Sequence, residues 1–143
     1  MGSTSAQIEQ GYRISAAWLS IKTGRTLKLP TGAEWEKAMR GTEGRLYPWG
    51  NQYNSGKLNN ADAGPFATMP AGSFPEGASP YGVLDGAGNV FEWTRTDWPG
   101  GKKTVKGGSW DDHGGMCRPA ARHGRPTPLR HILVGFRLVE EFE

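Results

Sequence analysis

The sequence has 143 residues, the size of one domain, with 22 glycines, 10 prolines, six Trp, five Phe and four Tyr. The glycine content excludes a helical bundle, the aromatic content argues against disorder, and no apolar run approaches the roughly 18–20 residues of a membrane span. The net charge of +3 is weak support for nucleic-acid binding, which needs a clustered basic stripe. We therefore expect one folded domain, rich in turns and loops, with no nucleic-acid partner and no membrane insertion.

Helical periodicity marks the beginning of the chain. Apolar residues at positions 8, 12, 16, 19 and 21 predict a helix over 5–23, which Gly24 would end. After a short extended connector over 25–29, Thr31 and Glu34 have the spacing of a capping box, in which each side chain binds the backbone N–H of the other residue. A second, short helix is predicted over 32–40, ended by Gly41.

From Gly41 onward the pattern changes to short extended pieces between glycine-rich turns. Strands are predicted over 90–93, 103–110 and 134–139, with a long irregular loop over 111–133. Long loops of this kind tend to be functional or disordered. The short basic cluster of Lys102, Lys103 and Lys106 is interpreted as a solvated hairpin tip.

The first residues, 1–4, fit a cloning remnant or a disordered start to a single domain over 1–143. They show no basic region followed by an apolar core, so neither a secretory signal nor an anchor is visible. The sequence leaves the localisation of the protein open.

Five motifs follow one another in an order that is specific. From about residue 18 to residue 139 the chain resembles formylglycine-generating-enzyme-like (sulfatase-modifying factor) domains, a variant of the C-type lectin fold. The resemblance implies an α+β fold with two helices, short twisted antiparallel sheets and long loops. Family domains usually have further strands before the first helix, which is where this sequence starts. The motifs are Leu29-Pro-Thr-Gly-Ala-Glu-Trp-Glu36, Tyr47-Pro-Trp-Gly-Asn51, Gly88-Asn-Val-Phe-Glu-Trp93, Gly107-Gly-Ser-Trp110 and Gly135-Phe-Arg137.

Four tryptophans fall within these motifs, and each can bury on the order of 200 Å2. We expect them to anchor the core of a fold that has little regular structure. They are Trp35, Trp49, Trp93 and Trp110.

The cysteine count bears on catalysis. The oxidase branch of the family, as the resemblance implies, binds copper with two cysteines just after the Gly-Gly-Ser-aromatic motif, whereas this chain has only Cys117. A two-thiolate copper site cannot be built within one such chain. Another branch holds iron with several histidines, but His113, His123 and His131 lie in the late loop without a ligand pair on a regular element. We expect a non-catalytic protein without a redox cofactor; the alternative is a metal-dependent oxidase or sulfur-transfer enzyme.

The composition of 111–133 suggests a different role. It contains no Lys, Glu, Gln or Trp, although Lys is frequent just before it and Glu just after it. Random replacement of the adenines in an Asn codon produces codons for most of the residue types found in 111–133, but for none of the four that are absent. The chain is similar to the variable proteins of diversity-generating retroelements, which commonly use this lectin-like domain and place variable residues around Gly-Gly-Ser-Trp, Cys-Arg-x-Ala-x-Arg and Gly-Phe-Arg. Met116 does not fit a diversified codon, and a chance shortage of four residue types is the alternative explanation.

This resemblance implies a ligand-binding protein whose C-terminal surface is diversified to recognise varied targets. A rigid scaffold tolerates changes in the contacts that it presents, as in an antibody paratope. The target would be a protein or glycan on a cell or virus, and the protein would be displayed on a surface or virion through a partner. The oligomeric state is left open.

The residues of 110–135 divide into two expected classes. Framework residues would hold the backbone: Trp110, Cys117, Arg118, Ala120, Arg122, Pro126, Arg130 and Gly135. Candidate variable positions would project to one solvent-facing surface: Asp111, Asp112, His113, Gly115, Ala121, His123, Gly124, Arg125, Thr127, Leu129, His131, Ile132 and Leu133. Three arginines, Arg118, Arg122 and Arg137, are expected to pair with backbone carbonyls or carboxylates, with an anionic-ligand site as the alternative.

A calcium site is a further expectation. Calcium prefers several oxygen ligands, and Asp85, the Ala87 carbonyl, Asn89 and Glu92 supply them within eight residues, at positions that match a calcium site of the enzyme family. The alternative is that Asn89 and Glu92 satisfy the backbone of a turn without a metal. A second set over 59–62, formed by Asn59, Asn60 and Asp62, resembles a cation site less closely.

Overall fold

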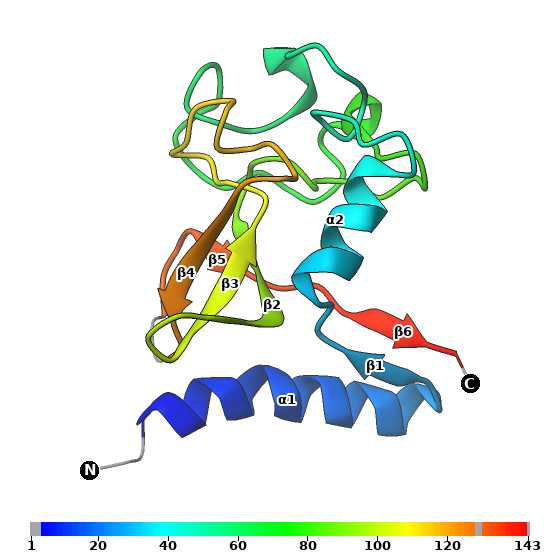
Figure 1. Ribbon diagram of the computed structural model, residues 1–143, viewed down its shortest axis with the longest axis vertical. Coiled ribbons are helices and arrows are strands. Elements are labelled where there is room, and N and C mark those ends of the chain that lie inside the picture. Colours follow the sequence, from blue (N-terminus) through cyan, green and yellow to red (C-terminus); the bar gives the residue numbers. More distant parts are fainter. Residues whose placement is uncertain (1–3, 128–129, 143) are drawn as a thin grey trace.

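The computed structural model describes residues 4–127 and 130–142, and side chains in this range from residue 13 onward. Figure 1 shows α1 crossing one end of the molecule, a small sheet in the middle and the long loops at the opposite end. The fold is α+β, as predicted. Its described elements are α1 (Thr4–Thr23), β1 (Thr26–Lys28), α2 (Gly32–Arg40), η1 (Ser55–Lys57), η2 (Pro75–Gly77), β2 (Phe91–Trp98), β3 (Lys102–Lys106), β4 (Arg122–Pro126), β5 (Val134–Gly135) and β6 (Val139–Glu141).

Local signals at the helix ends place both helices where the sequence predicts them. Gly24 follows α1 with a φ of 67°, a left-handed conformation that glycine adopts without strain. The Thr31 hydroxyl accepts a hydrogen bond from the Glu34 N–H at 3.0 Å, and the Glu34 carboxylate accepts one from the Thr31 N–H at 2.8 Å. The capping box is therefore confirmed. Gly41 ends α2 with a φ of 65°.

Two sheets organise the strands. The larger has the order β4-β3-β2-β5, in which β3 is antiparallel to β2 and β4, and β5 is parallel to β2; the smaller pairs β1 with β6. The main apolar core lies on the larger sheet and is completed from the segments that flank the smaller one. It consists of Leu29, Phe91, Trp93 and Val105, with Val134 and Leu138 packed against them.

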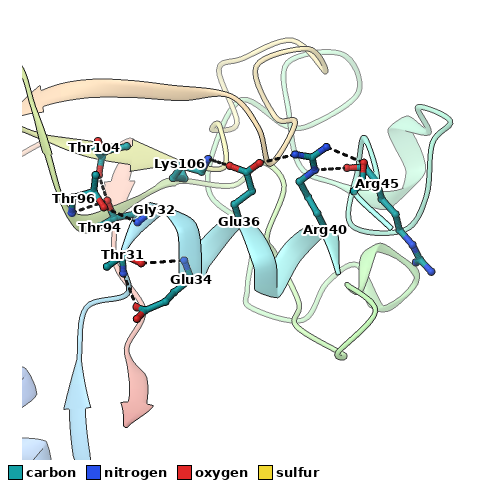
Figure 2. A network of polar contacts seen from close by, with 11 residues as sticks. Thr31, Gly32, Glu34, Glu36, Arg40, Arg45, Thr94, Thr96, Thr104 and Lys106 are labelled. Carbon is teal, nitrogen blue, oxygen red and sulfur yellow. Dashed lines mark hydrogen bonds and ion pairs between the residues drawn. The ribbon is translucent and has the colours of Figure 1, made fainter. Parts of the chain in front are cut away.

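Polar contacts hold α2 against the larger sheet (Figure 2). The Glu36 carboxylate pairs with the Lys106 ammonium of β3 at 2.8 Å and with Arg40 at 2.6 Å. The Trp35 indole N–H donates to the Glu92 carboxylate of β2 at 2.6 Å. The Lys106 side chain is only 2% exposed. The expectation that it lies on a solvated hairpin tip is therefore wrong, because it points at α2 instead of solvent.

Four predicted segments differ from the structure. The strand expected over 90–93 continues to Trp98 as β2. The strand expected over 103–110 ends at Lys106, because Gly107 and Gly108 adopt φ values of 102° and 72°. The strand expected over 134–139 is divided into β5 and β6, because Arg137 turns inward to the carboxylate of Glu92. The loop expected over 111–133 contains β4, which pairs with β3 along five residues.

The predicted apolar face of α1 is only partly covered. Of its predicted members, Ala16 is buried, Leu19 is half-buried and Ile21 is 83% exposed, and the side chains of residues 8 and 12 lie outside the described ones. Of the four expected tryptophan anchors, Trp35 and Trp93 are buried and Trp49 and Trp110 are half-buried. None of the described helices is long and apolar enough to cross a bilayer.

Candidate functional site

The loop that follows Gly107–Trp110 is held by polar contacts to the segment around residue 61. The Asp112 carboxylate accepts hydrogen bonds from the backbone N–H and the hydroxyl of Ser109, at 3.0 and 2.5 Å. The Ala61 N–H donates to the Asp112 carbonyl at 3.0 Å, and the Gly114 N–H donates to the Asp62 carboxylate at 3.2 Å. The backbone over 109–114 is therefore fixed on both sides. Asp112, a candidate variable position, uses its side chain inside this framework.

Tyr53 and Asp62 form the support beneath the loop. The Tyr53 hydroxyl is hydrogen-bonded to the Asp62 carboxylate, and the Asn60 amide donates to both. Burial, and then the hydrogen bond to Asp62, raise the pKa of Tyr53 to about 12, and the hydrogen bond from Tyr53 is the main cause that lowers the pKa of Asp62. Gly114 lies on the Tyr53 ring, so that an added Cβ would come within 2.8 Å of Tyr53 Cδ2. Sequence reasoning missed Tyr53, and it treated Asn60 and Asp62 only as cation ligands.

Cys117 lies in the core beneath the same loop. It is fully buried and packs with Leu58 and Ala87, against which Trp49 also lies. Burial, with the nearby negative charges of Asp112 and Asp62, raises the pKa of the thiol to about 12. Because the thiolate is the nucleophile and the metal ligand, Cys117 in this environment is an inert packing residue at neutral pH.

The three arginines expected to serve the framework contact different parts of the fold. Arg137 makes a two-pronged ion pair with Glu92, with both N–O distances at 2.6 Å, and also donates to the Leu84 carbonyl at 3.0 Å. Arg118 lies over the Tyr47 ring, with its guanidinium carbon 5.7 Å from the ring centroid. Arg122 begins the edge strand β4 and is exposed. Arg137 thus pairs with a carboxylate and a carbonyl, as predicted.

The candidate variable positions differ in exposure. Asp111, His113 and Gly115 are exposed before β4, and His131 and Ile132 are exposed after it. The half-buried positions are Asp112, Ala121, His123, Gly124, Arg125 and Leu133; Thr127 is buried, and Leu129 lies outside the described residues. The exposed positions therefore form two groups at the ends of β4, whose five residues span roughly 17 Å.

The β4 positions between these groups pack on the sheet. The His123 ring meets Phe91 edge-on at 5.6 Å between centroids, and the Arg125 guanidinium lies 5.6 Å from the same ring. On the other face, a Cβ added to Gly124 would overlap the Trp98 indole. Side chains at these positions are restricted by their neighbours, which sequence composition alone did not reveal.

The residues expected to bind calcium are engaged with one another and with the rest of the chain. Both oxygens of Glu92 face Arg137, and one also accepts from Trp35. An Asp85 oxygen accepts from the Gly72 N–H at 2.7 Å, and the Asn89 side-chain oxygen accepts from the backbone of residue 69 and the side chain of residue 59. In this conformation the set does not fit a cation, since Ca²⁺ would face the Arg137 guanidinium. Calcium binding here stays a prediction, with Asn89 satisfying a turn as its alternative.

The second cation set is similarly occupied. Asn60 and Asp62 bind Tyr53, although the buried side-chain oxygen of Asn59 has no hydrogen-bond partner among the described residues. His113, His123 and His131 do not gather, and within 4–127 and 130–142 no group of three His, Cys, Asp or Glu side chains is placed to hold a metal.

Comparison with known proteins agrees with this architecture. The sulfatase-modifying factor enzyme 1-like domain matches residues 13–142. The hercynine oxygenase of Mycolicibacterium smegmatis is 32% identical in an alignment of 151 positions, which covers 86% of this chain and 34% of the relative. The inactive C-alpha-formylglycine-generating enzyme 2 of Mus musculus is 36% identical over 132 residues, which cover 79% of this chain and 42% of the relative. The chain thus spans about a third to two fifths of the length of these relatives.

A solved structure is also similar. Treponema denticola variable protein 1 superimposes with a TM-score of 0.66 and 26% identity, covering 80% of this chain and 47% of that one. Together with the two helices, the curled sheets and the long anchored loops, this match supports the formylglycine-generating-enzyme-like form of the C-type lectin fold. By its sequence and its structure, the chain belongs to the family of sulfatase-modifying factor enzyme 1-like domains.

Proposed function

We propose that this chain is a non-catalytic ligand-binding protein whose surface around 111–133 is diversified by a retroelement. One observation carries the proposal: the backbone of the loop is anchored by buried and hydrogen-bonded groups, while neighbouring side chains point into solvent. Gly114 and Cys117 lie against the core, whereas His113 and Gly115 are exposed. Alternation of this kind lets contacts change without loss of the fold.

The similarity to Treponema denticola variable protein 1 supports the same function, because that protein is described as variable. The similarity to inactive C-alpha-formylglycine-generating enzyme 2 supports the absence of catalysis, since family members without activity exist. The buried thiol of Cys117 supports it physically, because a thiol with a pKa of about 12 is protonated at neutral pH.

The exposure pattern narrows the proposed contact surface. His113 and Gly115 flank Gly114, which lies on the ring of Tyr53, and Tyr53 is itself 41% exposed. Asp111 and Arg118 are exposed on either side of this stretch. Polar, glycine and aromatic residues of this kind are typical of antibody-like paratopes, where an aromatic ring gives contact area at low entropic cost. We expect this group to supply the main contacts to a protein or glycan surface.

Selection from a displayed library tests this function. Randomising Asp111, His113 and Gly115 should yield folded variants that bind streptavidin, used here as an arbitrary protein target. A control library of equal size randomises Thr42, Glu43 and Thr26, which are exposed elsewhere. Binders from the loop library alone would support the proposal. Loss of folding throughout the loop library, or equal enrichment from both libraries, would refute it.

The hercynine oxygenase relatives favour a second candidate, a metal-dependent oxidase or sulfur-transfer enzyme. That function predicts tight binding of iron or copper that is lost on replacing Cys117 or the histidines. Elemental analysis of protein purified without chelators decides between the candidates: stoichiometric iron or copper supports an enzyme, and the absence of both after incubation with each metal removes this candidate.

A further inference from the structure

A cavity of about 260 Å3 lies beside α1. One of its lining residues, Lys103, pairs in register with Arg125 of β4, so the cavity adjoins one end of the proposed binding segment. The cavity lies between α1, the last two residues of β1 and the β2–β3 hairpin. Figure 1 shows α1 running across this end of the molecule, below the hairpin. The residues that line the cavity come from four elements and the connector after β1: Arg13, Ala16, Ala17, Leu27, Lys28, Leu29, Arg95 and Lys103. The packing of α1 against the rest of the fold therefore leaves an open cavity between them.

The floor of this cavity is apolar. Ala16 and Leu29 are 7% and 6% exposed, and Leu27 is half-buried. Leu29 also belongs to the main core, so the cavity borders the apolar interior. Such a floor has no group that could hydrogen-bond water strongly, and an alkyl chain in place of water would be favoured by about 0.8 kcal/mol per buried methylene.

The walls carry four cations, from four different elements: Arg13, Lys28, Arg95 and Lys103. In the described part of the chain no carboxylate lines the cavity. Three of the cations pair with carboxylates that do not line the cavity: Glu34 is 3.1 Å from Arg95, Asp97 is 2.5 Å from Lys103, and Glu141 is 2.6 Å from Lys28.

These ion pairs leave the cations available to a ligand. The side chain of Asp97 is 88% exposed, and those of Glu34 and Glu141 are 46% and 55% exposed. Pairs of this exposure contribute little to stability, because water screens both charges. Arg95 and Lys103 can therefore also donate to an anion inside the cavity, where cationic side chains line the walls.

We propose that this cavity binds a medium-chain fatty acid, with the alkyl chain on Ala16, Leu27 and Leu29 and the carboxylate near Arg95 and Lys103. The cavity volume of about 260 Å3 lies just below the roughly 300–1,000 Å3 of typical small-molecule pockets, so it suits a small ligand. An apolar floor combined with cationic walls selects a molecule that has both an alkyl chain and a negative charge. The assignment does not depend on the binding function of the loop.

Isothermal titration of the full chain with octanoate tests the assignment. We expect one octanoate per chain, with affinity rising about fourfold per methylene from hexanoate to octanoate and falling as salt is added. Octanol, which has no charge, and inorganic phosphate, which has no chain, are the comparison probes, and both should bind much more weakly. Equal binding of octanol would overturn the role of the cations, and equal binding of phosphate would overturn the role of the alkyl chain.

Point variants of the cavity residues test whether octanoate binds in this cavity. Arg95→Gln should weaken octanoate about two- to fivefold, the range for one exposed charge contact, while Arg45→Gln, a matched change away from the cavity, should leave the affinity unchanged. Ala17→Leu should fill the cavity and abolish binding, while Ala33→Leu on α2 should not. A thermal melt of each variant checks folding. Octanoate affinity that is unchanged in both Arg95→Gln and Ala17→Leu would refute the assignment.

Discussion

Gly114→Ala is a sharp test of the anchored loop. Gly114 lies on the Tyr53 ring, and a Cβ built there would be 2.8 Å from Cδ2 and 3.0 Å from Cζ. Real Cβ atoms essentially never approach other atoms so closely, so either the ring or the loop must move. Movement of the ring strains its hydrogen bond to Asp62, which also accepts from the Gly114 N–H.

The expected loss follows from these contacts. Insertion of one methyl group into a well-packed site costs about 1–3 kcal/mol, and Tyr53 cannot simply swing away without loss of its contact with Tyr47, 5.6 Å between centroids. For a chain of this size, 1 kcal/mol corresponds to roughly 3–4 °C in Tm. We therefore expect Gly114→Ala to lower Tm by about 3–12 °C.

Gly115→Ala is the matched control, because Gly115 is the next residue and is exposed. An added Cβ there would meet only the ring of His113, an exposed side chain that can turn away. Differential scanning calorimetry of both variants should give a Tm within about 2 °C of the parent for Gly115→Ala, the effect expected of a surface change. Equal destabilisation by the two substitutions, or none by either, would refute the division of this loop into anchored and exchangeable residues.

Other predictions concern charge and the buried thiol. Glu36→Gln should lower the free energy of unfolding in urea by about 3 kcal/mol, because it leaves the buried Lys106 ammonium without its countercharge. Lys106→Met should lower it by less than about 1 kcal/mol, because Glu36 keeps its ion pair with Arg40. A larger loss for Lys106→Met than for Glu36→Gln would contradict this asymmetry. The hydrogen bond from the Thr31 backbone N–H is the main cause that lowers the pKa of Glu34. For Glu36, burial acts to raise the pKa, but the hydrogen bonds and charges of Lys106 and Arg40 outweigh burial and lower it. Both folded-state pKa values lie below 4.5, so these two carboxylates stabilise the fold above pH 4.5, and this stabilisation is lost as the pH falls through the folded-state values. A free energy of unfolding that does not decrease below pH 4.5 would contradict this prediction. Cys117, with a pKa of about 12, should not react with Ellman's reagent at pH 8 in the native protein and should react fully in urea; rapid native reaction would show an accessible thiolate.

Local signals explain which parts of the fold could be predicted. The capping box of Thr31 and Glu34 and the glycines after each helix act over a few residues, so the helix bounds follow from the sequence. β4 has no such signal: its glycine and proline disfavour a strand, and it forms because β3 offers an edge with which to pair. β4 therefore forms through its pairing with β3, a tertiary contact that the periodicity of its own sequence does not indicate.

The same distinction applies to the candidate site. The core position of Cys117 and the pairing of Arg137 with a carboxylate agree with the framework roles expected for these residues. The contact of Gly124 with Trp98 depends on the strand register and on the irregularity in β2, and the burial of Lys106 depends on the position of α2. The engagement of Glu92 by a residue 45 positions away likewise could not be read from its own motif.

The central claim is that 111–133 is a diversified surface on a fixed framework, and genomic sequencing around the coding region tests it most directly. The account predicts a near-copy of this stretch beside a reverse-transcriptase gene, differing only where the template has adenine. The differences should fall at codons of exposed positions such as Asp111, His113 and His131, and not at the codon of Cys117. The absence of any such copy, or differences spread over other bases and over the Cys117 codon, would contradict the claim.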